Sequence, residues 1–292
     1  MIFNISHRTS YLYGTPVTQS QHVVHLAPRN LPRQTVNRHS LLIEPAPASR
    51  FDRTDYFGNQ ATVLIIEDEH SELVVHSRSF VTIEPLPPID LSHSSAWGEV
   101  IWAAVQGDGM CDLSVHQFVC QSRHTPITPE ILAYAKPSFP TGRPVLEGAI
   151  DLTKRIHSEF IFDATATDIS TPIAQVLKAR RGVCQDFAHL SLACLRSLGL
   201  PARYVSGYLL TRPPPGKVKL QGTDASHAWV SLWAPEVGWV DFDPTNGLMP
   251  SDEHITVAYG RDYDDVSPIS GVLLGGSSQS MSVAVDVVEA AA

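Results

Sequence analysis

The chain has 292 residues, 43% of them hydrophobic and 17% charged, a composition typical of globular proteins and long enough for one large domain or two smaller ones. Its formal net charge is −9, and an acidic chain without a basic cluster is a poor match for a phosphate backbone, which argues against a nucleic-acid partner. No apolar run approaches the roughly 20 residues needed to cross a membrane, and the first residues lack a signal-peptide pattern, so we expect a cytoplasmic protein with no membrane partner.

The first part of the chain, residues 1–84, is predicted to form a β-rich domain. Short runs of β-branched and aliphatic residues are separated by turn residues, as in a β-sandwich. The runs are His39–Glu44, Ala61–Ile66, Leu73–Val75 and Ser79–Ile83, with a turn at Asp55–Asn59. The segment that follows Glu84 is rich in proline, and residues 85–96 are therefore predicted to be a linker.

Residues 97–292 are predicted to form a second domain that begins with helices. Apolar residues recur at spacings of three and four between Val145 and Phe160, which indicates one face of a helix. A second stripe of this kind runs from Val183 to Leu198, and Gly199 followed by Pro201 is a strong signal for the end of a helix.

After residue 201 the apolar period changes to two, which indicates strands. The predicted strands are 202–210, 227–234 and 239–245, and alternating valines at 283, 285 and 287 indicate a last strand near the C-terminus. Helices followed by strands, behind a β-rich domain, place the chain in the α+β fold class.

Cys184 is predicted to lie at the start of the second helix. The free N–H groups and the dipole at a helix N-terminus favour a thiolate and can hold a developing oxyanion. A cysteine is more commonly a core residue, as expected for Cys194 on the apolar stripe. The four cysteines form no C-x-x-C pair and the thirteen histidines no zinc-binding pattern, so we expect neither a metal site nor a cofactor.

A histidine and an aspartate follow on two neighbouring predicted strands. His227 begins the first strand, and Asp241 and Asp243 point the same way on the next. A strand histidine or a strand-end aspartate is ordinary by itself. The order of a helix-start cysteine, a strand histidine and a neighbouring aspartate suits a nucleophile, a base and the group that orients the base.

Several stretches resemble the bacterial transglutaminase-like family. In the second domain they are Gly182–His189, Pro201–Tyr208, Ser226–Trp229 and Gly238–Asn246, and in the first domain they include His25–Arg29 and Asp55–Asn59. The resemblance implies a papain-like core in which a helix carrying the cysteine packs on an antiparallel sheet. It also implies that Asp243, which precedes Pro244-Thr245, is the catalytic aspartate. The upstream Trp or Gln that supplies a second oxyanion donor in some relatives has no match.

From these residues we predict acyl transfer on the amide bonds of a peptide or protein through Cys184, His227 and Asp243, with a thioester intermediate and hydrolysis as the outcome. The alternatives are a true transglutaminase, which transfers the acyl group to an amine, and a protein-binding module with an unused triad. An acetyltransferase or a deglycosylating amidase would need an acyl-donor or glycan site that the sequence does not show. The oligomeric state is left open.

Overall fold

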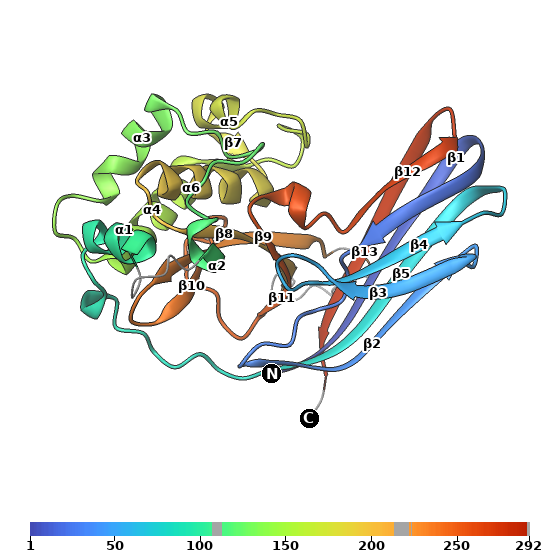
Figure 1. The fold of residues 1–292 in the computed structure, drawn as a ribbon, viewed down its shortest axis with the longest axis horizontal. Helices are drawn as coiled ribbons and strands as arrows, with labels where there is room; N and C mark the ends of the chain where they lie inside the picture. The colour runs from blue at the N-terminus through green and yellow to red at the C-terminus, as the bar shows by residue number, and fades with distance from the viewer. Residues whose placement is uncertain (107–112, 213–221, 223, 291–292) are drawn as a thin grey trace.

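The computed structural model describes residues 1–106, 113–212, 222 and 224–290. Figure 1 shows two parts side by side, a layer of long strands and a compact unit of helices packed on a smaller sheet. The sheets of both parts are antiparallel throughout, apart from one two-residue parallel pair. The predicted α+β class is therefore confirmed.

The N-terminal part is a seven-stranded sheet built around one long strand, β1 (Ile2–Val24). The strands of the sheet that come from the first 84 residues are β2 (Gln34–Glu44), β3 (Ser49–Thr54), β4 (Gln60–Ile66) and β5 (His70–Ile83). Both β4 and β5 pair with β1, β4 near its end and β5 near its beginning. On the outer side of each, β3 pairs with β4 and β2 pairs with β5, both antiparallel. The sheet thus has two halves that share β1.

An apolar cluster joins these two halves. It combines Val17 and Leu64 from one half with Leu41, Leu73 and Val75 from the other, all of them buried. Alternation along each strand sends every second side chain to this interior, as a two-residue period requires. The sheet therefore encloses a core of its own, in agreement with the predicted sandwich-like character.

The C-terminal strands complete this N-terminal sheet. Strands β12 (Ile269–Gly275) and β13 (Gln279–Glu289) pair with β1, with Val24 opposite Ile269 and Phe3 opposite Glu289. The alternation of valines predicted the last strand. It does not reveal the partner: the sequence predicts these residues as part of the domain 97–292, whereas β12 and β13 belong to the sheet of the N-terminal part.

The second part contains the helices and a four-stranded antiparallel sheet. The helices are α1 (Trp97–Gln106), α2 (Leu113–His116), α3 (Pro129–Ala135), α4 (Val145–Glu159), α5 (Ile173–Ala179) and α6 (Cys184–Ser197), with single turns η1 (Leu91–His93), η3 (Lys136–Ser138) and η4 (Tyr263–Asp265). The sheet order is β10 (Gly238–Phe242), β9 (Ser226–Ala234), β8 (Ala202–Leu209) and β11 (His254–Gly260), and β6 (Ile161–Phe162) pairs with β7 (Arg181–Gly182). Among the described helices, none has both the length and the apolar character that crossing a membrane requires.

The two helices predicted from periodicity carry the core of this part. Along α4, the apolar positions from Val145 to Ile156 are buried, as is Phe160 just after the helix. Helix α6 is buried on almost all sides between α3, α4 and the strands β8 and β9. It ends where Gly199 takes a φ of +82°, a left-handed conformation that glycine adopts without steric cost.

The two parts meet at the outer edge of β11, which is the last strand of its sheet. The Gln34 side-chain amide donates to the carbonyl of Thr256 over 2.7 Å and accepts from its N–H over 2.8 Å. Asn59 makes the same pair of bonds with the backbone of Tyr259, both 2.8 Å. These two amides occupy backbone groups that a further strand would otherwise have paired.

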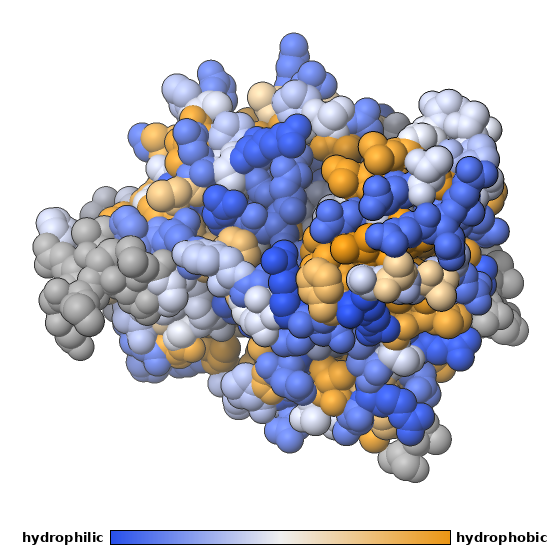
Figure 2. Space-filling model, turned by 45° about the vertical axis from the view of Figure 1, so that its right-hand side comes forward, coloured by the Kyte–Doolittle hydropathy of each residue, from blue (hydrophilic) through white to orange (hydrophobic). Residues whose placement is uncertain are grey.

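Figure 2 turns the molecule so that the N-terminal sheet comes forward, and apolar patches there are broken up by hydrophilic side chains. The exposed apolar residues of β1, β12 and β13 are Leu12, Val272, Leu274, Met281, Val283 and Val288. Exposed apolar side chains that are interspersed with polar ones in this way are common on protein surfaces.

Candidate active site

Cys184 is the first residue of α6, as predicted, and its side chain is half-buried. Asp186, two residues later, accepts the N–H of Val183 over 2.8 Å and so fixes the start of the helix. Gly182 leaves the space for this carboxylate, because a Cβ there would lie 2.6 Å from an Asp186 oxygen. The N–H of Cys184 precedes the hydrogen-bonded turns of the helix and is free to face a ligand.

His227 and Asp243 come from neighbouring antiparallel strands. His227 is the second residue of β9, and Asp243 follows the last residue of β10. The pairing of Asp241 with Ser231 places Asp243 near the start of β9, on the same face as His227. The His227 Nε2 lies 2.7 Å from Oδ2 of Asp243, and the two side chains are 9% and 0% exposed.

The environment of His227 favours its charged form. Burial opposes the charge, but the hydrogen bond with Asp243 and the Cys184 side chain within hydrogen-bonding reach outweigh burial and raise the pKa of His227 to about 10. The structure thus brings together the three residues singled out in the sequence. Asp243 and Cys184 both lie near enough to act on the imidazole of His227.

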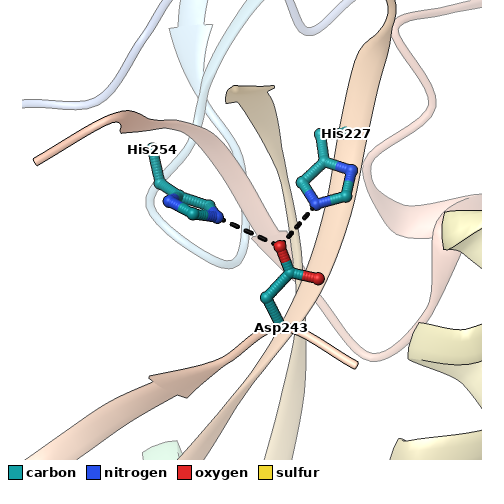
Figure 3. A group of neighbouring side chains, drawn as sticks. All are labelled: His227, Asp243 and His254. Atoms are coloured by element: carbon teal, nitrogen blue, oxygen red, sulfur yellow. Dashed lines mark hydrogen bonds and ion pairs between the residues drawn. The ribbon is translucent and has the colours of Figure 1, made fainter. Parts of the chain in front are cut away.

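Asp243 is held by a full set of donors. One oxygen accepts the N–H groups of Thr245 and Asn246, and the other accepts the Asn246 side-chain amide over 2.7 Å. The second oxygen also forms hydrogen bonds with the imidazoles of His227 and His254 (Figure 3). Burial by itself would raise the pKa of Asp243, but these hydrogen bonds outweigh it and hold the pKa well below its usual value.

His254 is a site residue that the sequence did not reveal. It begins β11, two strands away from His227, and its Nε2 lies 3.1 Å from Oδ2 of Asp243. The ring of Trp229 lies across Gly207 of the intervening strand and meets His254 edge-on, with 5.3 Å between ring centroids. Only the folded sheet order creates this contact, because no spacing in the linear sequence links position 254 to the triad.

The same three side chains could in principle hold a metal ion. The ligand atoms of His227, Asp243 and His254 all lie within 4.8 Å of one another. Such a set was not expected from the sequence, which predicted no metal site. Both histidines already face one carboxylate oxygen at hydrogen-bond distance, and these bonds account for the arrangement without an ion.

The remaining candidates of the sequence occupy different places. The carboxylate of Asp241 accepts the indole N–H of Trp229 over 2.9 Å, whereas Asp243 receives His227. Cys194 is fully buried, and burial raises the pKa of its thiol. Cys120 is exposed, and Cys111 lies outside the described residues.

Comparison with known proteins places this geometry in a family. Residues 3–82 match the model of the bacterial transglutaminase-like N-terminal region, and residues 133–244 match that of the transglutaminase-like superfamily. The second match contains all three residues, Cys184, His227 and Asp243. The chain belongs to the transglutaminase-like superfamily. Membership of this superfamily supports cysteine-based catalysis in general.

Some relatives resemble the transglutaminase-like chain over almost its full length, and others over a short stretch. An uncharacterized protein of Mycobacterium tuberculosis is 41% identical over 291 residues, which cover 98% of this chain and 92% of the relative. A shorter stretch of 72 residues, 24% of this chain and 11% of the relative, is 40% identical to a protein-glutamine gamma-glutamyltransferase of Pseudomonas aeruginosa. The fold is shared with a Cytophaga hutchinsonii protein described as a possible cysteine protease, with a TM-score of 0.75 and 20% identity over 100% of this chain and 92% of that one.

Proposed function

We propose that the chain is a cysteine hydrolase that cleaves amide bonds of peptides or proteins, with Cys184 as nucleophile, His227 as acid and base, and Asp243 as the residue that orients His227. The observation that carries the proposal is the position of His227. It lies 2.7 Å from a fully buried carboxylate, and the half-buried thiol at a helix start is near enough to raise the pKa of His227. Nucleophile, base and orienting group in this relation are what covalent acyl transfer requires.

In the first half of the proposed reaction, the Cys184 thiolate attacks the carbonyl carbon of the amide. The carbonyl oxygen takes up negative charge, which the N–H of Cys184 at the start of α6 can stabilise. His227 then gives its proton to the amide nitrogen, the C–N bond breaks, and the amine leaves. A thioester remains on Cys184. Asp243 keeps the imidazole in place throughout, since it is itself fixed by hydrogen bonds from both sides.

In the second half, an acceptor resolves the thioester. Water passes a proton to His227 and attacks the thioester carbon, the C–S bond breaks, and a carboxylic acid leaves together with the regenerated thiolate. A primary amine in place of water would form a new amide, which is the transglutaminase alternative. The short stretch that is similar to a protein-glutamine gamma-glutamyltransferase is the reason to test that alternative as well.

The test is a screen of peptides that contain glutamine and internal amide bonds, each incubated with and without a primary amine and analysed by mass spectrometry. We expect hydrolysis products under both conditions, and a loss of rate of at least about 10³-fold in Cys184→Ala. Cys120→Ala is the matched control, because this exposed thiol should be dispensable. Amine incorporation that exceeds hydrolysis would assign a transglutaminase, and turnover that survives Cys184→Ala would exclude the cysteine mechanism.

A further inference from the structure

A cavity lies between the two parts of the molecule, and none of the three proposed catalytic residues lines it. Its volume is about 590 Å³, within the range of pockets that hold small ligands. One wall comes from the N-terminal part around Arg29 and Arg33, and the other from the four-stranded sheet around Arg203 and Asp241. His254 also lines it, so that the cavity adjoins the site on the far side of Asp243.

Arg203 is the unusual residue of this cavity. Its guanidinium carbon lies 3.5 Å from the centroid of the Tyr259 ring and 4.2 Å from that of Trp239, so that aromatic rings take up its flat faces. Its Nε is buried without a hydrogen-bond partner among the described residues. The edge of the guanidinium, which carries the five N–H donors, is therefore available for a planar acceptor.

Among the described residues, the other cations of the cavity also lack a close ion-pair partner, although Asp55 and Asp241 lie near enough to favour the charges of Arg29 and Arg203. Within the described ranges, no carboxylate lies within ion-pair distance of Arg29, Arg33 or Arg203. Arg29 donates to the Phe57 carbonyl and the Asn59 side chain, and Arg33 to the carbonyls of Glu84 and Pro85. Asp241 is the acidic residue of the lining, and one of its oxygens already accepts the Trp229 indole. In a chain of net charge −9, this is a locally positive cavity.

Much of the rest of the lining is apolar. Aliphatic side chains from the N-terminal part and the linker, among them Leu31, Ile83 and Ile89, line it together with Trp229 and Trp239. A ligand that fills such a space needs a hydrophobic body beside its charged group. Inorganic phosphate has the charge but not the body, and a neutral amide has the body but not the charge.

We propose that this cavity binds a small carboxylate with an apolar body, with its carboxylate on the edge of Arg203 and its body against the aliphatic wall. The free oxygen of Asp241 is placed to accept an N–H of the same ligand. An N-acylated amino acid or the C-terminal residue of a peptide has all three features. The inference is independent of the proposed function, because it concerns binding and none of the triad residues lines the cavity.

The experiment compares two probes of equal shape, N-acetyl-L-phenylalanine and N-acetyl-L-phenylalaninamide, with inorganic phosphate as a third. Binding is measured by titration calorimetry and by tryptophan fluorescence, since Trp229 and Trp239 line the cavity. Cys184→Ala protein is used beside the unchanged chain so that turnover cannot consume the amide. We expect the acid to bind at least about tenfold more tightly than either other probe, because a bidentate carboxylate–guanidinium pair is a strong charge-assisted contact.

Variants locate the binding. Arg203→Met keeps the stem between the rings and should weaken binding of the acid at least about tenfold, and Arg203→Lys should fall between. Arg53→Met, at an exposed position of β3, is the matched control and should bind normally. Equal binding of acid and amide, equal binding of phosphate, no binding of any probe, or an Arg203→Met variant with undiminished binding would each overturn the proposal. The comparison of probes on the unchanged chain remains decisive even if a variant fails to fold.

Discussion

At the residue scale, the charge of His227 depends on its two neighbours. With its pKa raised to about 10, the imidazole keeps its proton through neutral pH, while Asp243 on its other side is ionised. A charged imidazole beside a thiol is the arrangement that stabilises a thiolate. His227 therefore carries the proton that the leaving amine needs in the proposed first step.

The reactivity of Cys184 follows from this arrangement. We predict that iodoacetamide at about pH 6 labels Cys184 far faster than Cys194, Cys120 or Cys111, and that His227→Ala slows the labelling of Cys184 at least about tenfold because the ion pair is lost. Cys120 is the informative internal control, since it is exposed and has no histidine partner within the described part of the chain. Timed alkylation followed by peptide mass spectrometry gives all four rates. Equal rates in the folded protein would show that the thiol is not activated and would favour a binding module.

The ion pair between His227 and Asp243 should also make stability depend on pH. The raised pKa of His227 gives stability that is present in full below about pH 6.5 and is lost as the pH rises through about 10. The lowered pKa of Asp243 gives stability that is present above about pH 4 and is lost as the pH falls. The pair thus contributes its full stabilisation between about pH 4 and about pH 6.5.

We therefore predict that Asp243→Asn lowers the free energy of unfolding by about 3–5 kcal/mol near pH 5, and by progressively less as the pH rises toward 10. Urea unfolding at pH 5, 7.5 and 10 measures the change, with Asp90→Asn, an exposed carboxylate, as the control. A penalty that stays constant across this range would mean that the pair is not ionised as inferred.

The cluster of His227, Asp243 and His254 makes a prediction about metal ions. We expect chelation by EDTA to leave Cys184 labelling unchanged. Added Zn²⁺ should slow the labelling, because zinc takes histidine and carboxylate ligands and would draw His227 away from the thiol. His254→Gln should reduce the sensitivity to zinc by about tenfold or more, since outer partners and ligands of a metal site carry effects of that size. Loss of labelling on chelation, restored by zinc, would instead indicate a resident metal.

At the scale of single elements, local patterns predicted what depends on neighbours along the chain. The three- and four-residue spacings gave α4, and the cysteine at the start of α6 was correctly placed by the stripe that begins at Val183. The strand that carries His227 and the one that precedes Asp243 were found from their alternation. In contrast, the positions in a sheet that must be glycine depend on side chains from other strands, because those side chains fill the space that a Cβ would need.

Gly207 is such a position. A Cβ there would lie 2.2 Å from the Ile255 carbonyl and 2.5 Å from the Trp229 ring, which passes over it toward His254. We predict that Gly207→Ala lowers the free energy of unfolding by about 1–3 kcal/mol, as overpacking does, and disturbs the Trp229–His254 contact. Gly98→Ala in α1 is the matched control. It meets nothing within 4 Å and should be neutral or stabilising. Thermal unfolding of both variants tests this, and equal behaviour would show that the sheet relaxes around Gly207.

At the scale of the whole molecule, long-range pairing was beyond the reach of the sequence. Alternating valines indicated a last strand, but β13 lies beside β1 because of the fold, with Val285 opposite His7 at the other end of the chain. Buried residues of β1 and β13, Phe3 and Val287 among them, share one apolar cluster with Tyr208 of the four-stranded sheet. That residues 1–84 fold as a separate unit remains a prediction. The shared cluster and the C-terminal strands couple this unit to the remainder of the chain.

The last prediction concerns the two amides that hold the parts together. Gln34 and Asn59 satisfy backbone groups of Thr256 and Tyr259 at the outer edge of β11, and truncation would leave buried donors and acceptors unpaired. Each unsatisfied group costs about 1–3 kcal/mol, so we expect the double variant Gln34→Ala, Asn59→Ala to lose several kcal/mol of unfolding free energy. The exposed Gln60 provides the control, Gln60→Ala, with little effect. Because β11 also carries His254, Cys184 labelling in the double variant should become slower before the protein unfolds. Denaturant unfolding combined with timed alkylation measures both effects, and a double variant as stable as Gln60→Ala would show that the edge of β11 needs no cover.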